Sequence, residues 1–280
     1  MSNSTRPDQA IVDKWNALVS SLRDMGSVVV AFSGGVDSAL VLKAAHDALG
    51  DQVVAATGLS ETYAPEEMEE AKKVAEHIGA RHEMVRTMEL TDHRYASNTH
   101  QRCFFCKTEL YTQLQQFAKV RGLAVIVDGT NADDLGDFRP GIRAGKNLGV
   151  RSPLVEERIG KSDIRALSNW LDLPTWNKPA AACLSSRFAY GDPITVEKLK
   201  QVSAAESAIR TLGFRGFRVR HHGEIARLEF PSEDLADAFE RRDDIISGVK
   251  SAGYAYVTID LDGFRSGRMN EGLNAHLKPH

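Results

Sequence analysis

The chain has 280 residues, and its 35 lysines and arginines against 38 acidic residues give a formal net charge of -3. This balance makes nucleic acid an unlikely partner, because nucleic-acid binders usually carry a basic excess. No apolar stretch of about 18 residues occurs, and the N-terminus lacks the features of a signal peptide. We therefore expect a cytoplasmic protein with no membrane partner. Three cysteines are too few for a disulfide framework and indicate reactive, metal-bound or buried thiols.

Helices and strands alternate along the first half of the chain. Apolar periodicity predicts helices over residues 11–25, 40–49, 65–78 and 104–120, and buried strands over 28–32, 53–56, 82–85 and 123–127. This alternation is typical of a parallel sheet covered on both faces. The predicted fold class is therefore α/β, with a doubly wound parallel sheet.

The second half begins with a polar stretch from 129 to about 161, which is too long for an ordinary connection and is expected to carry function. A short helix over 162–171 follows. Beyond Pro193 the pattern predicts a helix, a strand, a strand at 225–230, a helix at 235–249 and a strand at 254–261. We place the domains at 1–188 and 189–280, the second being a smaller α+β domain for substrate binding and oligomerisation.

The string SGGVDS lies between the first predicted strand and the next helix. Gly34 and Gly35 let the backbone approach a ligand, and a helix N-terminus offers unpaired N–H groups and a partial positive charge. The string therefore favours a bound pyrophosphate, with hydroxyl donors from Ser33 and Ser38. Asp37 would need a divalent cation there, so we assign it to Mg²⁺. The alternative is an ordinary glycine-rich turn capped by serine.

This string resembles the signature of the PP-loop, or N-type, ATP pyrophosphatases, and it lacks the GK[ST] ending of a Walker loop. The resemblance implies cleavage of ATP into AMP and pyrophosphate through an adenylated substrate. The family includes both amidating synthetases and sulfur-transfer enzymes, and the cysteines help to distinguish them.

Cys103 and Cys106 form a C-x-x-C motif at a predicted helix start, so their sulfurs lie on one face, close enough to share a metal. With Cys183 as a third ligand, the fourth position could belong to a histidine on zinc or to the open iron of a [4Fe-4S] cluster. Zinc with His93 or His100, and unrelated buried or redox thiols, are the alternatives. The PP-loop favours sulfur transfer.

Three further strings resemble the LarE family of sulfur transferases. They are DGTNADD at 128–134 with RPG at 139–141, ACLSSRF at 182–188, and GFRSGRMN at 263–270. The similarity extends from about residue 10 to about 275.

The LarE resemblance implies that ATP adenylates a carboxylate of pyridinium-3,5-biscarboxylic acid mononucleotide and that sulfur then replaces oxygen. The product serves the nickel-pincer nucleotide cofactor of lactate racemase. Some members sacrifice the sulfur of one cysteine at the position of Cys183, whereas others hold a [4Fe-4S] cluster on three cysteines, and this sequence matches the second pattern. A sulfur donor and a homo-oligomer are expected as well.

The site residues are expected in three groups. The ATP site is expected to contain Ser33, Gly34, Gly35, Asp37, Ser38, Asp128 and Gly129, with Asp37, Asp133 and Asp134 as Mg²⁺ ligands. Catalytic roles are expected for Cys183, Asp37, Glu206, Ser186 and Arg187. The substrate carries a phosphate, which calls for bidentate arginines, namely Arg218, Arg220, Arg265 and Arg268.

Several of these residues also have simpler interpretations. Asp134 and Glu206 could be solvated acids, and Ser186 could cap a helix. Arg218 and Arg220 alternate on a strand, and an exposed strand face is usually charged.

The leading hypothesis is an ATP-dependent sulfur insertase acting on a nucleotide-like carboxylate. The first rival, a tRNA thiolase, is weakened by the charge balance and by the absence of an obvious added RNA-binding domain. An amidating synthetase would usually need a glutaminase or an ammonia channel, and the sequence supplies no separate glutaminase. A non-catalytic iron–sulfur or nucleotide sensor would release no AMP or pyrophosphate.

Overall fold

A computed structural model describes residues 6–136, 140–179 and 182–265 of the chain. The chain divides into two compact units, one formed by Met1–Glu89 and Cys103–Ala181, the other by Leu90–Arg102 and Ala182–His280. The second unit therefore includes two segments, 90–102 and 182–188, that the expected boundary after residue 188 would assign to the first.

The first unit is built on a four-stranded parallel sheet. Its strands are β1 (Val28–Ala31), β2 (Val53–Leu59), β3 (Arg81–Arg86) and β4 (Val125–Val127). They are ordered β3-β2-β1-β4, so the chain moves outward from β1 in one direction and then returns to its other side. Such a reversal between neighbouring strands opens a crevice at their carboxyl ends, where α/β proteins bind ligands.

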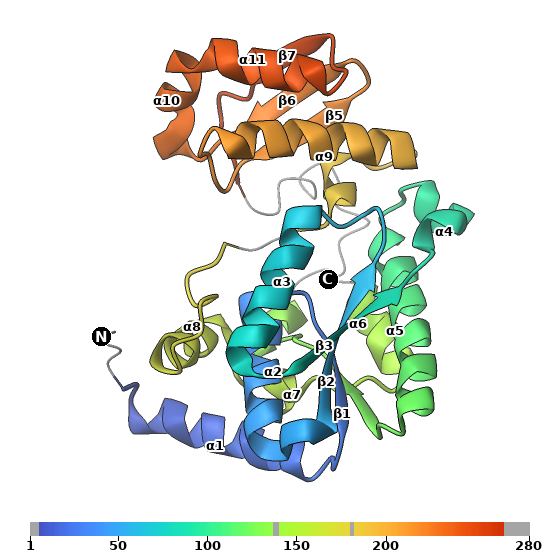
Figure 1. Cartoon of the computed structure of the whole chain (residues 1–280), viewed down its shortest axis with the longest axis vertical. Helices are drawn as coiled ribbons and strands as arrows, with labels where there is room; N and C mark the ends of the chain where they lie inside the picture. Colours follow the sequence, from blue (N-terminus) through green and yellow to red (C-terminus); the bar gives the residue numbers. More distant parts are fainter. Residues whose placement is uncertain (1–5, 137–139, 180–181, 266–280) are drawn as a thin grey trace. The chain divides into compact units, whose positions relative to one another are not determined.

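Helices cover both faces of this sheet, as predicted for a doubly wound α/β fold (Figure 1). One face packs against α1 (Gln9–Arg23), α2 (Val36–Leu49), α3 (Pro65–Ile78) and α8 (Lys161–Trp170). The other face packs against α5 (Arg102–Arg121). All four residues of β1 are buried, which explains why this strand is continuously apolar.

The polar stretch from 129 to 161 contains short helices that periodicity did not predict. They are η3 (Ala132–Gly136), α6 (Pro140–Asn147) and α7 (Pro153–Glu156). Pro140 and Pro153 each occupy a first helical position, where the missing N–H costs no hydrogen bond. Helices this short bury few residues, so their apolar pattern is weak. The remaining short elements of the first unit are η1 (Gly50–Gln52) and η2 (Glu89–Thr91), which ends in the second.

The second unit contains a three-stranded sheet of order β5-β6-β7. The strands are β5 (Arg218–His222), β6 (Ile225–Glu229) and β7 (Tyr256–Ile259), with β5 and β6 antiparallel and β6 and β7 parallel. The helices are α4 (His93–Ala96), η4 (Leu184–Arg187), α9 (Val196–Thr211), η5 (Ser232–Asp234), α10 (Leu235–Glu240) and α11 (Arg242–Ser251). Side chains of α9 and α11 form one apolar core with one face of the sheet.

The single helix predicted over 235–249 is wrong, because the chain breaks at Arg241 into α10 and α11. Arg241 has φ -96° and ψ 20°, outside the helical range, and its guanidinium donates to the carbonyl of Leu212. Apolar residues on both sides of the break face one core, so the apolar pattern continues through it. No helix among the described residues combines the length and apolar character needed to cross a bilayer.

Candidate active site

The SGGVDS string forms the turn from β1 to α2, as the sequence predicted. Gly34 has φ +68°, and a Cβ on it would lie 2.8 Å from both Cα and Cβ of Ala71 in α3. Only glycine therefore allows α3 to pack this closely on the turn. The Oγ atoms of Ser33 and Ser38 lie 3.2 Å apart and link the two ends of the turn.

The N-terminus of α2 is arranged to receive an anion. Gly35 is the N-cap and contributes no side-chain hydrogen bond. The first backbone N–H groups of an α-helix have no partner within the helix, and the helix dipole adds positive potential there. This geometry suits the pyrophosphate part of ATP.

The carboxyl end of β4 lies beside this turn. A Cβ on Gly129 would lie 2.8 Å from the backbone nitrogen of Ser38 and 3.2 Å from the carbonyl carbon of Asp37. A real Cβ essentially never lies as close as 2.8 Å to another heavy atom. Glycine at position 129 therefore lets the chain after β4 pass this close to the start of α2. Its place at the ATP site stays a prediction.

Asp128 is buried and accepts hydrogen bonds from its own chain. Oδ2 accepts from Tyr111 at 2.7 Å and from the Thr130 hydroxyl at 2.9 Å, while Oδ1 accepts from Ser152 at 2.8 Å. Burial and the Asp128 carboxylate raise the pKa of Tyr111 well above its usual value, so Tyr111 stays a hydrogen-bond donor. Asp128 is thus equipped to hold the loop after β4 in place.

Asp37 and Asp133 both contact Lys161, the first residue of α8 and one that sequence reasoning did not single out. Lys161 Nζ lies 2.7 Å from both carboxylate oxygens of Asp37, and its backbone N–H donates to Asp133 at 2.7 Å. Asp134 is buried, and its Oδ2 accepts from the backbone of Asn131. The structure therefore brings two predicted Mg²⁺ ligands to one lysine and turns the third toward the backbone.

Lys178 is a second cation at the SGGVDS turn that sequence reasoning did not identify. Its ammonium donates to the Gly34 carbonyl at 3.3 Å and pairs with Glu67 at 3.2 Å and Glu70 at 2.8 Å. Burial alone would lower the pKa of Lys178, but the two carboxylates outweigh it and raise the pKa. Lys178 is therefore charged at neutral pH and directly bound to the turn.

The three cysteines, all within the described residues, form no disulfide and lie in two different units. Cys103 is exposed and Cys106 half-buried near the start of α5 in the first unit, while half-buried Cys183 precedes η4 in the second. Among the described residues, no three His, Cys, Asp or Glu side chains are grouped so as to hold a metal ion. His93 and His100, the zinc alternatives, belong to the second unit. The cluster and Mg²⁺ sites stay predictions.

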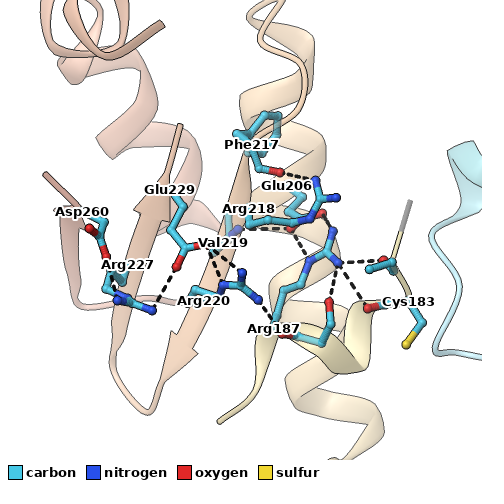
Figure 2. A network of polar contacts seen from close by, with 12 residues as sticks. Cys183, Arg187, Glu206, Phe217, Arg218, Val219, Arg220, Arg227, Glu229 and Asp260 are labelled. Carbon is cyan, nitrogen blue, oxygen red and sulfur yellow. Dashed lines mark hydrogen bonds and ion pairs between the residues drawn. The ribbon is translucent and has the colours of Figure 1, made fainter. Parts of the chain in front are cut away.

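Cys183 lies in a tight turn, which we call the Cys183 turn (residues 182–187). Hydrogen bonds from Arg187 stabilise it. The Arg187 guanidinium donates to the carbonyls of Ala182 at 2.7 Å and Cys183 at 3.2 Å, and to the Ser186 hydroxyl at 2.8 Å (Figure 2). Its other two nitrogens pair with the Glu206 carboxylate at 2.7 and 2.9 Å.

Glu206 is 1% exposed, so its interpretation as a solvated helical acid is wrong. It also accepts from the Val219 backbone at 3.1 Å, which ties α9 to β5. Burial would raise the pKa of Glu206, but Arg187 outweighs it and the pKa is lowered. Glu206 is therefore a carboxylate at neutral pH, engaged with its own chain.

The four predicted substrate arginines have different surroundings. Arg220 is buried and occupied by Glu229 and the Ser186 carbonyl, so the exposed-face interpretation is wrong for it. Arg218 is half-buried, with its guanidinium 4.8 Å from the ring centre of Phe264. Arg265 is exposed and lies 3.7 Å from Asp262. Arg268 falls outside the described residues.

A parallel sheet with an anion-binding turn after its first strand, placed where the strand order reverses, defines a nucleotide-binding α/β protein. The NAD synthase family matches residues 9–117, which contain this turn. Pyridinium-3,5-bisthiocarboxylic acid mononucleotide synthase of Lactiplantibacillus plantarum is 42% identical over 264 residues, covering 94% of this chain and 96% of that protein. The chain therefore belongs to the LarE family of ATP-dependent sulfur transferases, which confirms the resemblance.

Two uncharacterized proteins are also similar. One from Synechocystis sp. is 45% identical over 252 residues, covering 89% of this chain and 94% of its own. One from Methanocaldococcus jannaschii is 32% identical over 169 residues, covering 60% and 66% respectively.

Proposed function

We propose that this chain adenylates a carboxylate of pyridinium-3,5-biscarboxylic acid mononucleotide with ATP and replaces oxygen by sulfur, releasing AMP and pyrophosphate. The product is the kind of molecule named for the Lactiplantibacillus plantarum relative. The observation that carries the proposal is the SGGVDS turn, with the N-terminus of α2 packed against Gly129. We expect this activity in the cytoplasm, in a homo-oligomer supplied by a sulfur donor.

A carboxylate is a poor electrophile, so adenylation is needed to make its carbon reactive and AMP a leaving group. Negative charge then accumulates on the departing pyrophosphate, and cations placed beforehand stabilise it. The α2 N-terminus, Lys161 and Lys178 each place positive charge at the turn. We assign to them the binding of ATP and the release of pyrophosphate.

Mg²⁺ is proposed at Asp37, Asp133 and Asp134. Asp37 and Asp133 suit this ion by their hard carboxylate oxygens; one contacts the ammonium and the other the backbone N–H of Lys161. Asp134 is the weakest of the three, since one oxygen accepts from Asn131. When bound, Mg²⁺ would neutralise phosphate charge.

A [4Fe-4S] cluster is proposed on Cys103, Cys106 and Cys183. Three cysteines can ligate three irons of such a cluster, and the fourth iron is then left without a protein ligand. Cys103 and Cys106 lie one turn apart on α5, and none of the three cysteines is held in a disulfide. When bound, the cluster would supply an open iron that can carry an extra sulfide. Zinc and uncoordinated thiols remain the alternatives.

The reaction is tested by incubating anaerobically prepared protein with ATP, Mg²⁺, a sulfide source and the biscarboxylic acid mononucleotide. We expect AMP, pyrophosphate and a product heavier by the mass difference between sulfur and oxygen. Unfractionated tRNA in place of the mononucleotide tests the thiolase, and ammonia in place of the sulfide source tests the amidating synthetase. A sensor would release neither AMP nor pyrophosphate with any of them.

The role of Cys183 is tested by Cys183→Ala, with Cys106→Ala and Cys103→Ala beside it. We expect adenylation to persist and sulfur transfer to disappear in Cys183→Ala. Loss of adenylation as well would make Cys183 structural. Absorption spectra with iron, sulfide and zinc analysis decide the metal, and a colourless protein with stoichiometric zinc would exclude the cluster.

A further inference from the structure

Three buried arginines hold the Cys183 turn by its main chain. Besides Arg187, Arg102 donates to the Ser185 carbonyl at 2.8 Å and Arg220 donates to the Ser186 carbonyl at 2.6 Å. Residues 102, 187 and 220 are 4%, 5% and 8% exposed, so their guanidinium groups face the protein interior. Together they bind the carbonyls of residues 182, 183, 185 and 186.

Arg220 forms a charged cluster with Arg227 and Glu229, in which Glu229 supplies the negative charge between two arginines. In the antiparallel register of β5 and β6, Arg220 lies directly opposite Arg227, and like charges at such positions repel. Glu229, two residues after Arg227 on the same face, contacts both of them (Figure 2). Its Oε2 accepts from Arg220 Nε at 2.9 Å, and its Oε1 accepts from Arg227 at 3.0 Å.

Glu229 is completely buried, and Arg227 is additionally anchored to Asp260 at 2.7 Å. With its Nε held by Glu229, Arg220 keeps another nitrogen directed at the Ser186 carbonyl. Without that carboxylate, Arg220 and Arg227 would repel each other and Arg220 would leave this geometry. The hydrogen bond to the Cys183 turn thus depends on a residue in β6.

We propose that Glu229 is a positioning residue for sulfur transfer, acting through Arg220 on the Cys183 turn, and that Arg220 serves this turn instead of binding substrate. The proposal rests on the proposed function, in which Cys183 takes part in the sulfur step. A reacting group displaced by about 1 Å can lose about 100-fold in rate, so a loosened turn should slow sulfur transfer far more than adenylation.

The test uses Glu229→Gln, which keeps shape and removes charge, with Asp237→Asn as the control. Asp237 is an exposed acid in the same unit, 3.8 Å from Arg241. We expect Glu229→Gln to slow sulfur transfer about 100-fold while the KM of adenylation for the carboxylate substrate changes less than about threefold. A KM increase of about tenfold or more would assign the cluster to substrate binding and overturn the proposal.

The double variant Arg220→Gln/Glu229→Gln separates positioning from stability. A neutral pair leaves no uncompensated charge between these two positions, so its melting temperature should exceed that of Glu229→Gln. The shorter side chain introduced by Arg220→Gln cannot reach the Ser186 carbonyl as the guanidinium does, so sulfur transfer should stay slow. Recovery of transfer together with stability would show that Glu229 is merely structural.

A second readout does not depend on turnover. In metal-free protein, alkylation of Cys183 by iodoacetamide is followed by mass spectrometry, with Cys103 and Cys106 as internal references. We expect Glu229→Gln to alter the Cys183 rate by about threefold or more, and to leave the reference rates unchanged. An unchanged Cys183 rate would overturn the proposal. If the wild-type protein makes no product, the proposed function fails, and this readout still decides the role of Glu229.

Discussion

Replacing Glu206 by glutamine tests the most deeply buried ion pair of the site. Arg187 is 5% and Glu206 1% exposed, so the substitution leaves a buried guanidinium without its countercharge. Removing one partner of such a pair typically lowers the free energy of unfolding by about 3–5 kcal/mol. We expect the lower end, about 3 kcal/mol, because Arg187 keeps its acceptors in the Cys183 turn and glutamine can still accept from Val219.

The stability lost in Glu206→Gln should be larger at neutral pH than in acid. The pKa of Glu206 is lowered from its ordinary value of 4.5, so the folded protein binds the proton more weakly than the unfolded chain. The carboxylate therefore stabilises the fold above the unfolded pKa, and this contribution disappears as the pH falls below 4.5 through the folded pKa. The stability difference between wild type and Glu206→Gln should be full at neutral pH and shrink in acid.

Urea unfolding measured by far-UV circular dichroism at a series of pH values gives this difference. All three tryptophans, Trp15, Trp170 and Trp176, lie in the first unit, so their fluorescence is an internal reference for the unit that does not contain Glu206. Asp237→Asn should change stability by less than about 0.5 kcal/mol. A loss below about 1 kcal/mol in Glu206→Gln, or one independent of pH, would refute the reasoning.

Two further predictions concern the SGGVDS turn. Gly129→Ala places a Cβ 2.8 Å from the Ser38 nitrogen, so we expect the KM for ATP to rise at least about tenfold in pyrophosphate-release assays. Gly136→Ala, where a Cβ would meet no atom within 4 Å and φ is not positive, is the steric control, and an equal effect on KM would contradict the contact. Lys178→Met removes the ammonium bound to Gly34 and leaves Glu67 and Glu70 facing the turn, which should raise the KM for ATP about tenfold, with partial recovery in Lys178→Arg. Equal KM values in wild type and Lys178→Met would exclude Lys178 from ATP binding.

Local patterns in the sequence predicted what depends on neighbouring residues. The alternation of strands and helices indicated the parallel sheet, and the SGGVDS string specified the turn from β1 to α2 because its glycines, hydroxyls and helix start are consecutive. The LarE strings identified the family for the same reason. These features could be predicted because the residues that determine them are close together in the sequence.

Features that depend on distant residues could not be predicted in this way. Lys161 and Lys178 are isolated lysines in polar segments, and their partners Asp37 and Gly34 lie 124 and 144 positions away. The burial of Glu206 follows from Arg187, 19 positions earlier on a different element. A charged residue on a helix is expected to be solvent-exposed unless its partner is known, and only the folded chain brings that partner to it.

The Cys183 turn is held by hydrogen bonds from arginines to its carbonyl oxygens, and the thiol takes no part in any of those hydrogen bonds. The chemical fate of the side chain is thereby separated from the shape of the backbone. Sulfur at this position could be ligated, modified or removed, and the same arginines would still meet the same oxygens. A protein built in this way can alter the reactive atom of its site without refolding around the change.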